Sequence, residues 1–458
     1  MSRRDRGRPP APDSIRPFEF PPVETGALGN DMEVRVVRSS PFPIVTGMIV
    51  LRSGETAVPD GKGGLAVLTG NALEGGTKRL SSRELARELE DIGAGFGVAA
   101  GWDSTTVAVS CMADRLQDAL PLLSEMVRRP AFPPADFERY RAQLVAGAAH
   151  RRMDPSSLAS DAFARFVFGD GADYGRPLAG TEASLEGRTP ADAHGFVAAR
   201  YGPSEAALIV AGDVEPAEAL SLAERDFGEW DRVIEPGPDP GAPSRCRERA
   251  VHLIHRPGSV QSEIRIGHPG VARSVEDYFS LMVLNLVLGG SFSSRLNLNL
   301  RERNGFTYGV RSRFSARRGA GPFVVSTSVD NAVTGAAVRE ILREVEGVVE
   351  GGPTREEVEA ATSYMAGVFP LRVETTGQIA ARVAELVIFD LPGDYYRSYR
   401  DRVREVTVDR AAASARRHIR PEELCTVVVG DADEVQQQLE ALGAGPVSVH
   451  RDGDEAVP

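Results

Sequence analysis

Two segments far apart in this chain match each other without a gap. Residues 203–213 read P-S-E-A-A-L-I-V-A-G-D, and residues 421–431 read P-E-E-L-C-T-V-V-V-G-D. Each has the pattern of a short buried strand that ends in Gly-Asp and closes its half of the chain after a helix. The match indicates an internal duplication, which restricts the fold to two similar halves.

The run 235–245 (E-P-G-P-D-P-G-A-P-S-R) separates these halves. Its closely spaced Pro and Gly residues cannot continue a helix or a central strand. The chain has 458 residues, which is also too long for one hydrophobic core. We therefore predict a flexible tail over 1–28, a first domain over 29–232, a linker over 233–248, a second domain over 249–445 and a tail over 446–458.

Strands alternate with helices inside each half. Ser81 with Glu84, and Thr354 with Glu357, have the spacing of capping boxes that open helices. The other predicted elements are strands at 34–37 and 47–53, a helix at 63–73, extended structure at 96–111, a strand pair within 251–267, helices at 277–288 and 293–303, and a strand at 306–316. This order predicts an α+β fold of two tandem homologous domains, each an antiparallel-rich sheet with helices packed on one face.

Charge and cysteine content exclude several classes of function. A net charge of −12 argues against a general nucleic-acid surface. The cysteines, Cys111, Cys246 and Cys425, form no Cys-x-x-Cys pair, so neither a disulfide framework nor a structural zinc site is expected.

The basic, Pro-rich start is not followed by the apolar stretch of an export signal. No window approaches about 18 apolar residues, so we expect a cytoplasmic protein without a membrane partner.

The seven histidines do not form a recognisable metal motif. None lies in a His-Glu-x-x-His or His-x-x-Glu-His arrangement. His252 and His255 are close in sequence, but they are three residues apart in a predicted strand, so their side chains point to opposite faces. No Ser or Cys lies on a recognisable nucleophile elbow either.

Residues 288–310 contain a second candidate for a catalytic site. A helix is predicted to end at Gly305, which can adopt the left-handed conformation, and a strand follows. Arg301 lies in the last helical turn and Tyr308 on the strand, so the guanidinium of Arg301 and the hydroxyl of Tyr308 could point into one cavity. The same residues also have a structural interpretation, because an Arg near a helix C-terminus complements the dipole and a Tyr in a strand usually packs.

Residues 64–77, G-L-A-V-L-T-G-N-A-L-E-G-G-T, resemble the zinc-binding helix of insulinase/pitrilysin-type zinc metallopeptidases, G-L-A-H-F-L-E-H-M-L-F-x-G-T. In that family the two His bind zinc and the Glu activates water. The matching positions here are Val67, Gly70 and Asn71, which can do neither. The family's third ligand, a Glu, falls within 145–148, which reads V-A-G-A. The resemblance therefore implies that this chain binds no catalytic zinc at that place.

The segment 288–310 resembles the second-half motif of the same family, L-G-G…S-R-L…L-R-E…G-x-x-Y, in which an Arg and a Tyr face the zinc. These family residues correspond to Arg301 and Tyr308. The turn formed by Gly289, Gly290 and Ser291 is a weaker substrate-binding candidate, or a plain helix-breaking turn. Further matches, such as Y-G-R-P-L-A-G-T at 174–181, extend the resemblance over roughly residues 30 to 440.

Some members of this family are heterodimers in which one subunit supplies the zinc ligands and the other only the Arg and Tyr. The resemblance implies that this chain is the second kind of subunit, inactive alone, with no cofactor of its own. Its expected partner is a homologous subunit that carries zinc and His-x-x-Glu-His, and the substrates are peptides. Two alternatives are a catalytically inert structural or assembly subunit of the same fold, and a peptidase with a relocated metal site.

Overall fold

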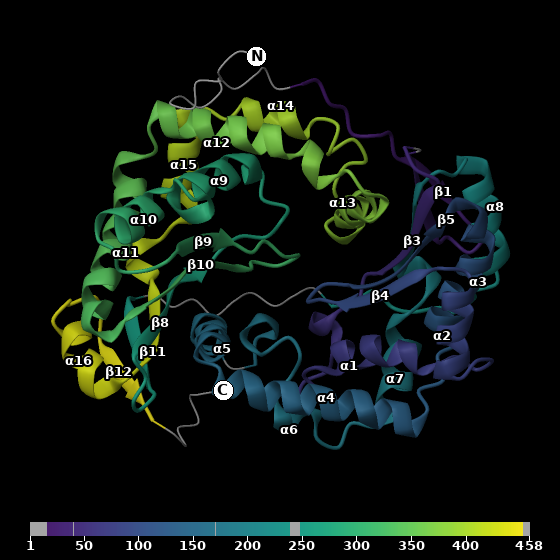
Figure 1. The fold of residues 1–458 in the computed structure, drawn as a ribbon, viewed down its shortest axis with the longest axis horizontal. Helices are drawn as coiled ribbons and strands as arrows, with labels where there is room; N and C mark the ends of the chain where they lie inside the picture. Colours follow the sequence, from purple (N-terminus) through teal and green to yellow (C-terminus); the bar gives the residue numbers. More distant parts are fainter. Residues whose placement is uncertain (1–15, 40, 170, 239–247, 452–458) are drawn as a thin grey trace, which may run out of the picture.

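The computed structural model describes residues 16–39, 41–169, 171–238 and 248–451, which form two lobes, one from each half of the chain (Figure 1). Each lobe contains a six-stranded sheet and confirms the predicted α+β fold. The first sheet consists of β1 (Glu24–Ala27), β2 (Glu33–Arg38), β3 (Ile44–Leu51), β4 (Gly95–Ala100), β5 (Thr105–Met112) and β6 (Ala206–Gly212). The second consists of β7 (Ala250–His255), β8 (Gln261–Pro269), β9 (Val310–Phe314), β10 (Pro322–Asp330), β11 (Cys425–Gly430) and β12 (Val447–His450).

The two sheets have the same internal topology. Their strand orders are β1-β2-β6-β3-β5-β4 and β12-β7-β11-β8-β10-β9, so that β2 to β6 correspond to β7 to β11. The matched segments of the sequence are the central strands β6 and β11. β6 pairs in parallel with β2 and antiparallel with β3, and β11 pairs in the same way with β7 and β8. The sheets are therefore mixed, although antiparallel pairs predominate.

Helices of the first half are α1 (Leu65–Ala72), α2 (Ser82–Asp91), α3 (Leu116–Arg128), α4 (Pro134–Met153), α5 (Pro155–Phe168), α6 (Glu182–Leu185), α7 (Pro190–Arg200) and α8 (Pro216–Phe227). Those of the second half are α9 (Tyr278–Asn285), α10 (Arg295–Asn297), α11 (Thr334–Gly351), α12 (Arg355–Val368), α13 (Thr376–Ile388), α14 (Tyr399–Arg404), α15 (Val408–His418) and α16 (Ala432–Glu440). Both predicted capping boxes are present, at the start of α2 and of α12.

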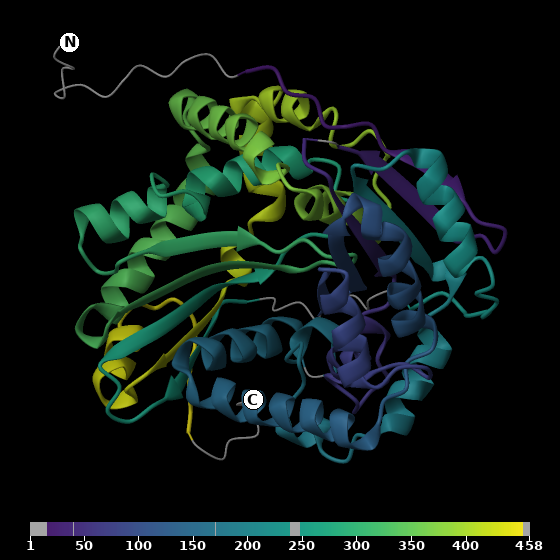
Figure 2. The same cartoon turned by 45° about the vertical axis from the view of Figure 1, so that its right-hand side comes forward.

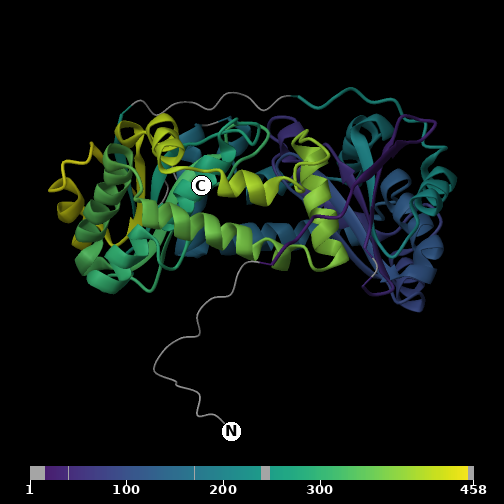
Figure 3. The same cartoon turned by 90° about the horizontal axis from the view of Figure 1, so that it is seen from above.

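The helices of each half pack on one face of its own sheet, as predicted, and the two halves exchange one helix each to cover the second face. The second face of the first sheet is covered by α13 of the second half, where Ile379 packs with Val50 and Ile209 in one core (Figure 1, Figure 3). The second face of the second sheet is covered by α5 of the first half, where Phe163 packs with Val427. Every residue of β6 is buried because both faces of this strand are covered.

The predicted tails are too long at both ends. Phe20 is buried against Phe369 and Tyr396, and β1 begins before residue 28. At the other end β12 pairs with β7, so residues 447–450 belong to the second sheet. Both strands have four residues at a sheet edge, which is too short to show a periodic pattern. Residues 1–15, 239–247 (within the predicted linker) and 452–458 lie outside the described residues.

In addition to the exchanged helices, a contact between the tips of two hairpins joins the halves (Figure 2). Asp103 lies in the turn between β4 and β5, and Arg318 and Gly319 lie in the turn between β9 and β10. One carboxylate oxygen of Asp103 accepts the backbone N–H of Arg318 at 2.9 Å. The other accepts the hydroxyl of Tyr174 at 2.8 Å, and this hydroxyl in turn accepts the N–H of Gly319 at 3.1 Å. The halves are therefore tied by hydrogen bonds as well as by shared cores.

The helical run Tyr278–Arg303 is long and apolar enough to cross a membrane, judged by length and composition alone. Most of its apolar window, 61%, is buried inside the fold. Leu281, Leu284 and Leu288 from this run pack in the core of the second half. The run therefore has the environment of a core helix in a water-soluble domain.

Candidate functional site

A buried carboxylate supports the start of α1, although the helix lacks the His and Glu side chains of the zinc-binding helix that it resembles. Gly64 precedes the helix with φ of 85°, a conformation that favours glycine. The buried carboxylate of Glu55 accepts the N–H groups of Gly64 at 2.5 Å and of Ala66 at 3.3 Å. Burial raises the pKa of Glu55 to about 7, while these hydrogen bonds and Arg176 oppose the rise. The N-terminus of α1 is thus held by an internal acid.

The three degenerate positions on α1 have become part of the packing. Gly70 is buried, and a Cβ there would lie 3.3 Å from both the Ala100 Cβ and the Val98 Cγ1 of β4. Val67 and Asn71 are half-buried on the same helix. The edge strand β4 therefore approaches α1 in a way that a Glu at position 70 would obstruct.

The region of the expected third ligand lies on α4, which packs against α1. Val145 packs against the core of the first half, and Ala148 is buried. Neither side chain offers a ligand atom, so α4 contributes only packing next to α1.

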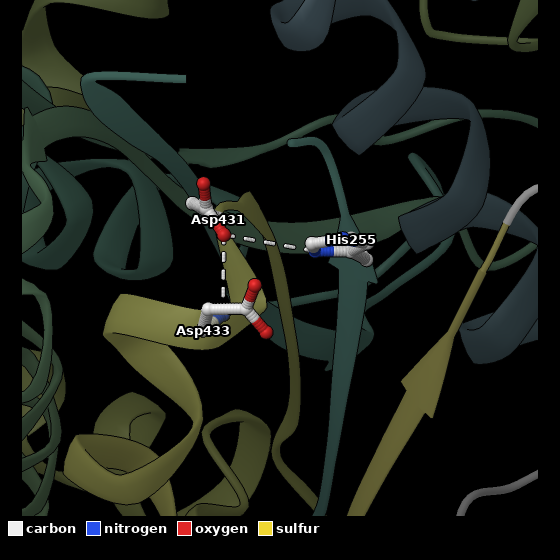
Figure 4. A group of neighbouring side chains, drawn as sticks. All are labelled: His255, Asp431 and Asp433. Atoms are coloured by element: carbon white, nitrogen blue, oxygen red, sulfur yellow. Dashed lines mark hydrogen bonds and ion pairs between the residues drawn. The ribbon is translucent and has the colours of Figure 1, made fainter. Parts of the chain in front are cut away.

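Among the described residues, one group of His, Cys, Asp or Glu side chains is close enough to hold a metal ion: His255, Asp431 and Asp433, with ligand atoms within 4.8 Å of one another (Figure 4). The polar atoms of Asp431 and His255 already accept backbone N–H groups. Asp431 caps α16 and accepts the N–H groups of Gly258 at 2.7 Å and of Asp433 at 3.1 Å. The Nδ1 atom of His255 accepts the N–H of Ala432 at 3.1 Å. These contacts explain the group as a helix cap.

His252 points away from His255, as its strand position predicts. Its ring stacks on Phe166 with centroids 3.8 Å apart, and its Nδ1 lies 3.1 Å from the Nε2 of His450. Burial lowers the pKa of His252 to about 4, and the neighbouring His450 adds to this effect. His252 is therefore a packed, neutral side chain at physiological pH.

Arg301 lies in the last turn before the helical run ends. Residues Leu298–Arg303 form a π-helical turn, and Gly305, with φ of 66°, follows it as predicted. The guanidinium of Arg301 lies 4.2 Å from the centroid of the Phe292 ring and 3.6 Å from Glu302. Phe292 was not singled out from the sequence, although it is the aromatic residue in the turn G-G-S-F-S-S before the helix.

Tyr308 lies in a loop, because β9 begins at Val310 rather than at residue 306. The hydroxyl of Thr307 accepts the N–H of Gly309 at 3.1 Å, a local turn that delays the strand. Tyr308 is 97% exposed, and within the described residues its hydroxyl has no hydrogen-bond partner. The prediction that Arg301 and Tyr308 point into one cavity is therefore not met within this chain, where Tyr308 lies on the surface.

A helix ends at Gly289, Gly290 and Ser291, which agrees with the helix-breaking interpretation of this segment. Leu286–Gly290 forms a π-helical turn that continues α9, and Ser291 is extended. A Cβ at Gly289 would lie 2.5 Å from the backbone nitrogen of Ser312, so glycine permits the close approach of β9. Gly290 is exposed and lines a cavity with Arg273 and Tyr278.

Two family models match the chain. The model described as insulinase (peptidase family M16) matches residues 34–181, and the model described as peptidase M16 inactive domain matches residues 188–365. An uncharacterized zinc protease of Streptomyces coelicolor is 26% identical over 315 residues, 68% of each chain. One of Mycobacterium leprae is 26% identical over 348 residues, 74% of this chain and 76% of the relative.

Solved structures have the same fold. A peptidase M16 inactive domain from Pseudomonas fluorescens has a TM-score of 0.84 at 23% identity and covers 89% of this chain and 98% of its own. A protease from Helicobacter pylori also has a TM-score of 0.84, at 18% identity, over 89% and 99%. A chain of complex III2 from Candida albicans has a TM-score of 0.76 at 13% identity, over 92% and 99%.

Proposed function

The chain belongs to the insulinase family of zinc peptidases, peptidase M16, and we propose that it is the non-catalytic subunit of a two-subunit member. A homologous partner with His-x-x-Glu-His binds the zinc, and this chain contributes Arg301 and Tyr308 to the hydrolysis of peptides. The observation that carries the proposal is the contrast between a repacked α1 and a Tyr308 side chain that is exposed to solvent.

The packing around α1 supports a catalytic role outside this chain's own first half. Gly70 lies so close to β4 that a larger side chain at this position, such as the family's Glu, would have to displace the side chains of Val98 and Ala100. Glu55 still holds the helix N-terminus, so the element itself is preserved as a structural part. Loss of chemistry with retention of the fold is what a supporting subunit requires.

The surface around Arg301 supports contact with a second molecule. Tyr308 is 97% exposed and Phe292 is 70% exposed, and the ring of Phe292 holds the guanidinium of Arg301. Exposed aromatic residues and arginine are enriched where protein interfaces contribute most of their binding energy. A partner or an extended peptide that covers this surface would remove the apolar surface of the two aromatic rings from water.

The chemistry assigned to these residues is oxyanion stabilisation. The partner's zinc supplies an activated water for attack on a peptide carbonyl. Negative charge then develops on the carbonyl oxygen, and the Tyr308 hydroxyl is free to donate a hydrogen bond to it. Arg301 binds a backbone carbonyl of the substrate or the same oxyanion. One such donor is worth about 10²–10³-fold in rate.

The test is co-purification of this chain with a homologous His-x-x-Glu-His chain, followed by peptide-cleavage assays. We expect turnover by the pair and none by this chain alone. Tyr308→Phe should lower kcat about 10²–10³-fold while the pair still elutes together in size-exclusion chromatography. Tyr364→Phe, which removes a hydroxyl from another exposed tyrosine, is the matched control. Unchanged turnover by the Tyr308→Phe pair would refute the oxyanion role.

A second candidate function is an inert assembly subunit. The similarity to a chain of Candida albicans complex III2 favours it, although that likeness concerns the fold alone. The same experiment separates the two functions, because an inert subunit would form a stable pair whose peptide turnover does not depend on Arg301 or Tyr308.

A further inference from the structure

A cavity of about 250 Å³ in the second half lies apart from Arg301 and Tyr308. Its walls come from α9 and its π-helical extension, from the end of α12 and from α13 and α14. It contains two notable kinds of side chain, namely guanidinium groups and aromatic rings. The guanidinium groups belong to Arg273, Arg372 and Arg382.

The charges that line this cavity do not balance. Its single lining carboxylate, Glu385, is already engaged by Arg382 and by the hydroxyl of Tyr396. Among the described residues, neither Arg273 nor Arg372 has an ion-pair partner. The cavity therefore has two more cationic groups than its own acid can neutralise, which favours an anion.

Arg273 is the buried cation of the pair, with 5% of its surface exposed. Its Nη2 donates to the Tyr395 hydroxyl at 2.8 Å, and its guanidinium lies 3.7 Å from the centroid of the Tyr278 ring. The rings stabilise the charge partly, but a buried guanidinium gains most from an oxyanion that accepts two of its N–H groups. Arg372 is exposed, so it can meet the same anion from the solvent side.

The remaining walls of the cavity offer hydroxyl groups and apolar surface. Tyr278 and Tyr399 line the cavity, and within the described part of the chain their hydroxyls have no hydrogen-bond partner. Phe279, Phe369 and Met282 supply apolar surface next to them. The cavity is thus rich in donors, poor in acceptors and partly aromatic, which suits a ligand with one anionic end and one apolar end.

We propose that this cavity binds a small organic carboxylate with an aromatic or branched apolar body. Arg273 receives the carboxylate, Arg372 faces it from the entrance, and the rings contact the apolar body. The volume lies just below the about 300–1,000 Å³ of sites for drug-sized ligands, which restricts the ligand to a small one. A free acid and the C-terminal residue of a peptide share this chemistry. The proposal does not depend on peptide hydrolysis.

Calorimetric titration of the full chain with 3-phenylpropionate tests the proposal, with 3-phenylpropan-1-ol as the uncharged probe of the same body. We expect the acid to bind about tenfold or more tightly than the alcohol. Arg273→Gln should remove this difference. Because substitution of the buried Arg273 can also disturb folding, Arg372→Ala and Tyr399→Phe are tested as separate variants. Each should weaken binding of the acid and leave binding of the alcohol unchanged. Arg355→Ala, at the exposed other end of α12, is the control.

A second titration identifies the source of the carboxylate. Tight binding of a tripeptide that ends in Phe, but not of its C-terminal amide, assigns the cavity to peptide ends, whereas binding of 3-phenylpropionate alone assigns it to free acids. Equal binding of acid and alcohol would overturn the proposal. No binding of any probe at millimolar concentration would also overturn it. So would binding of the acid with wild-type affinity by both folded variants, Arg372→Ala and Tyr399→Phe.

Discussion

The guanidinium of Arg317 lies 4.5 Å from the centroid of the Trp102 ring, although the two residues belong to different halves of the chain. The same guanidinium lies 4.3 Å from the ring of Tyr174. Burial lowers the pKa of Arg317 to about 10. A half-buried cation of the second half is therefore held mainly by aromatic rings of the first, next to the hydrogen bonds of Asp103.

Replacement of Arg317 by Ala should weaken the union of the halves. The loss of a desolvated cation–π contact and of its packing should lower the free energy of unfolding by about 1–3 kcal/mol. Urea titration followed by Trp fluorescence measures this. Arg311→Ala, on the exposed side of β9, should stay within about 0.5 kcal/mol of wild type. Equal unfolding midpoints for the two variants would contradict the interpretation.

Glu55 should make the protein less stable as the pH rises from 4.5 to 7. Below this window the carboxyl is protonated in both states, and inside it the unfolded chain ionises while the folded chain keeps the proton, since burial raises the folded pKa to about 7. Between pH 5 and 8 the loss should be about 2–3 kcal/mol. Glu55→Gln should remove it in urea titrations, whereas Glu90→Gln on α2 should not. An unchanged pH profile for Glu55→Gln argues against a raised pKa.

Restoring the family residues on α1 should not restore a zinc site. A variant with Val67→His, Gly70→Glu and Asn71→His still lacks a carboxylate within residues 145–148 of α4, and it forces a side chain against Ala100. We expect no stoichiometric zinc by elemental analysis after dialysis, and a free energy of unfolding lower by about 1–3 kcal/mol. One bound zinc per chain with unchanged stability would show that the site needs only these substitutions.

Cutting the chain between its halves should not separate them. A protease site inserted within 239–247 leaves both shared cores intact, because α13 packs on the first sheet and α5 on the second. After cleavage, size-exclusion chromatography should give one peak of the original size, which splits only in denaturant. Two half-sized peaks in native buffer would show that the shared cores are too weak to hold the halves together.

Local signals in the sequence predicted the elements well. Glu84 and Glu357 close the capping boxes that mark α2 and α12, and the repeated Gly-Asp segments are the central strands. The β-prone letters F-T-Y-G-V suggested a strand through Tyr308, but the Thr307 hydroxyl bonds to Gly309 and keeps Tyr308 in a loop. A local side-chain contact thus outweighed strand propensity.

Other features could not be predicted because they depend on partners distant in sequence. The unbroken apolar sequence of β6 indicates two buried faces, but no local signal shows that Ile209 meets a helix of the other half. Likewise, Arg273 is an isolated Arg in sequence, and only the fold brings it to Tyr278 and Tyr395. The stacking of Phe292 on Arg301 needs the bend of the helical run as well.

The helix exchange also limits how this molecule can move. A hinge that swung the two lobes apart would pull α13 from the first sheet and α5 from the second, and would expose Val50, Ile209 and Val427 to water. Such an opening costs a large part of the folding free energy, so it cannot serve as a routine gate. In the proposed two-subunit peptidase, access for a peptide would then depend on separation of this chain from its partner, and the lifetime of that pair would set how often peptides enter.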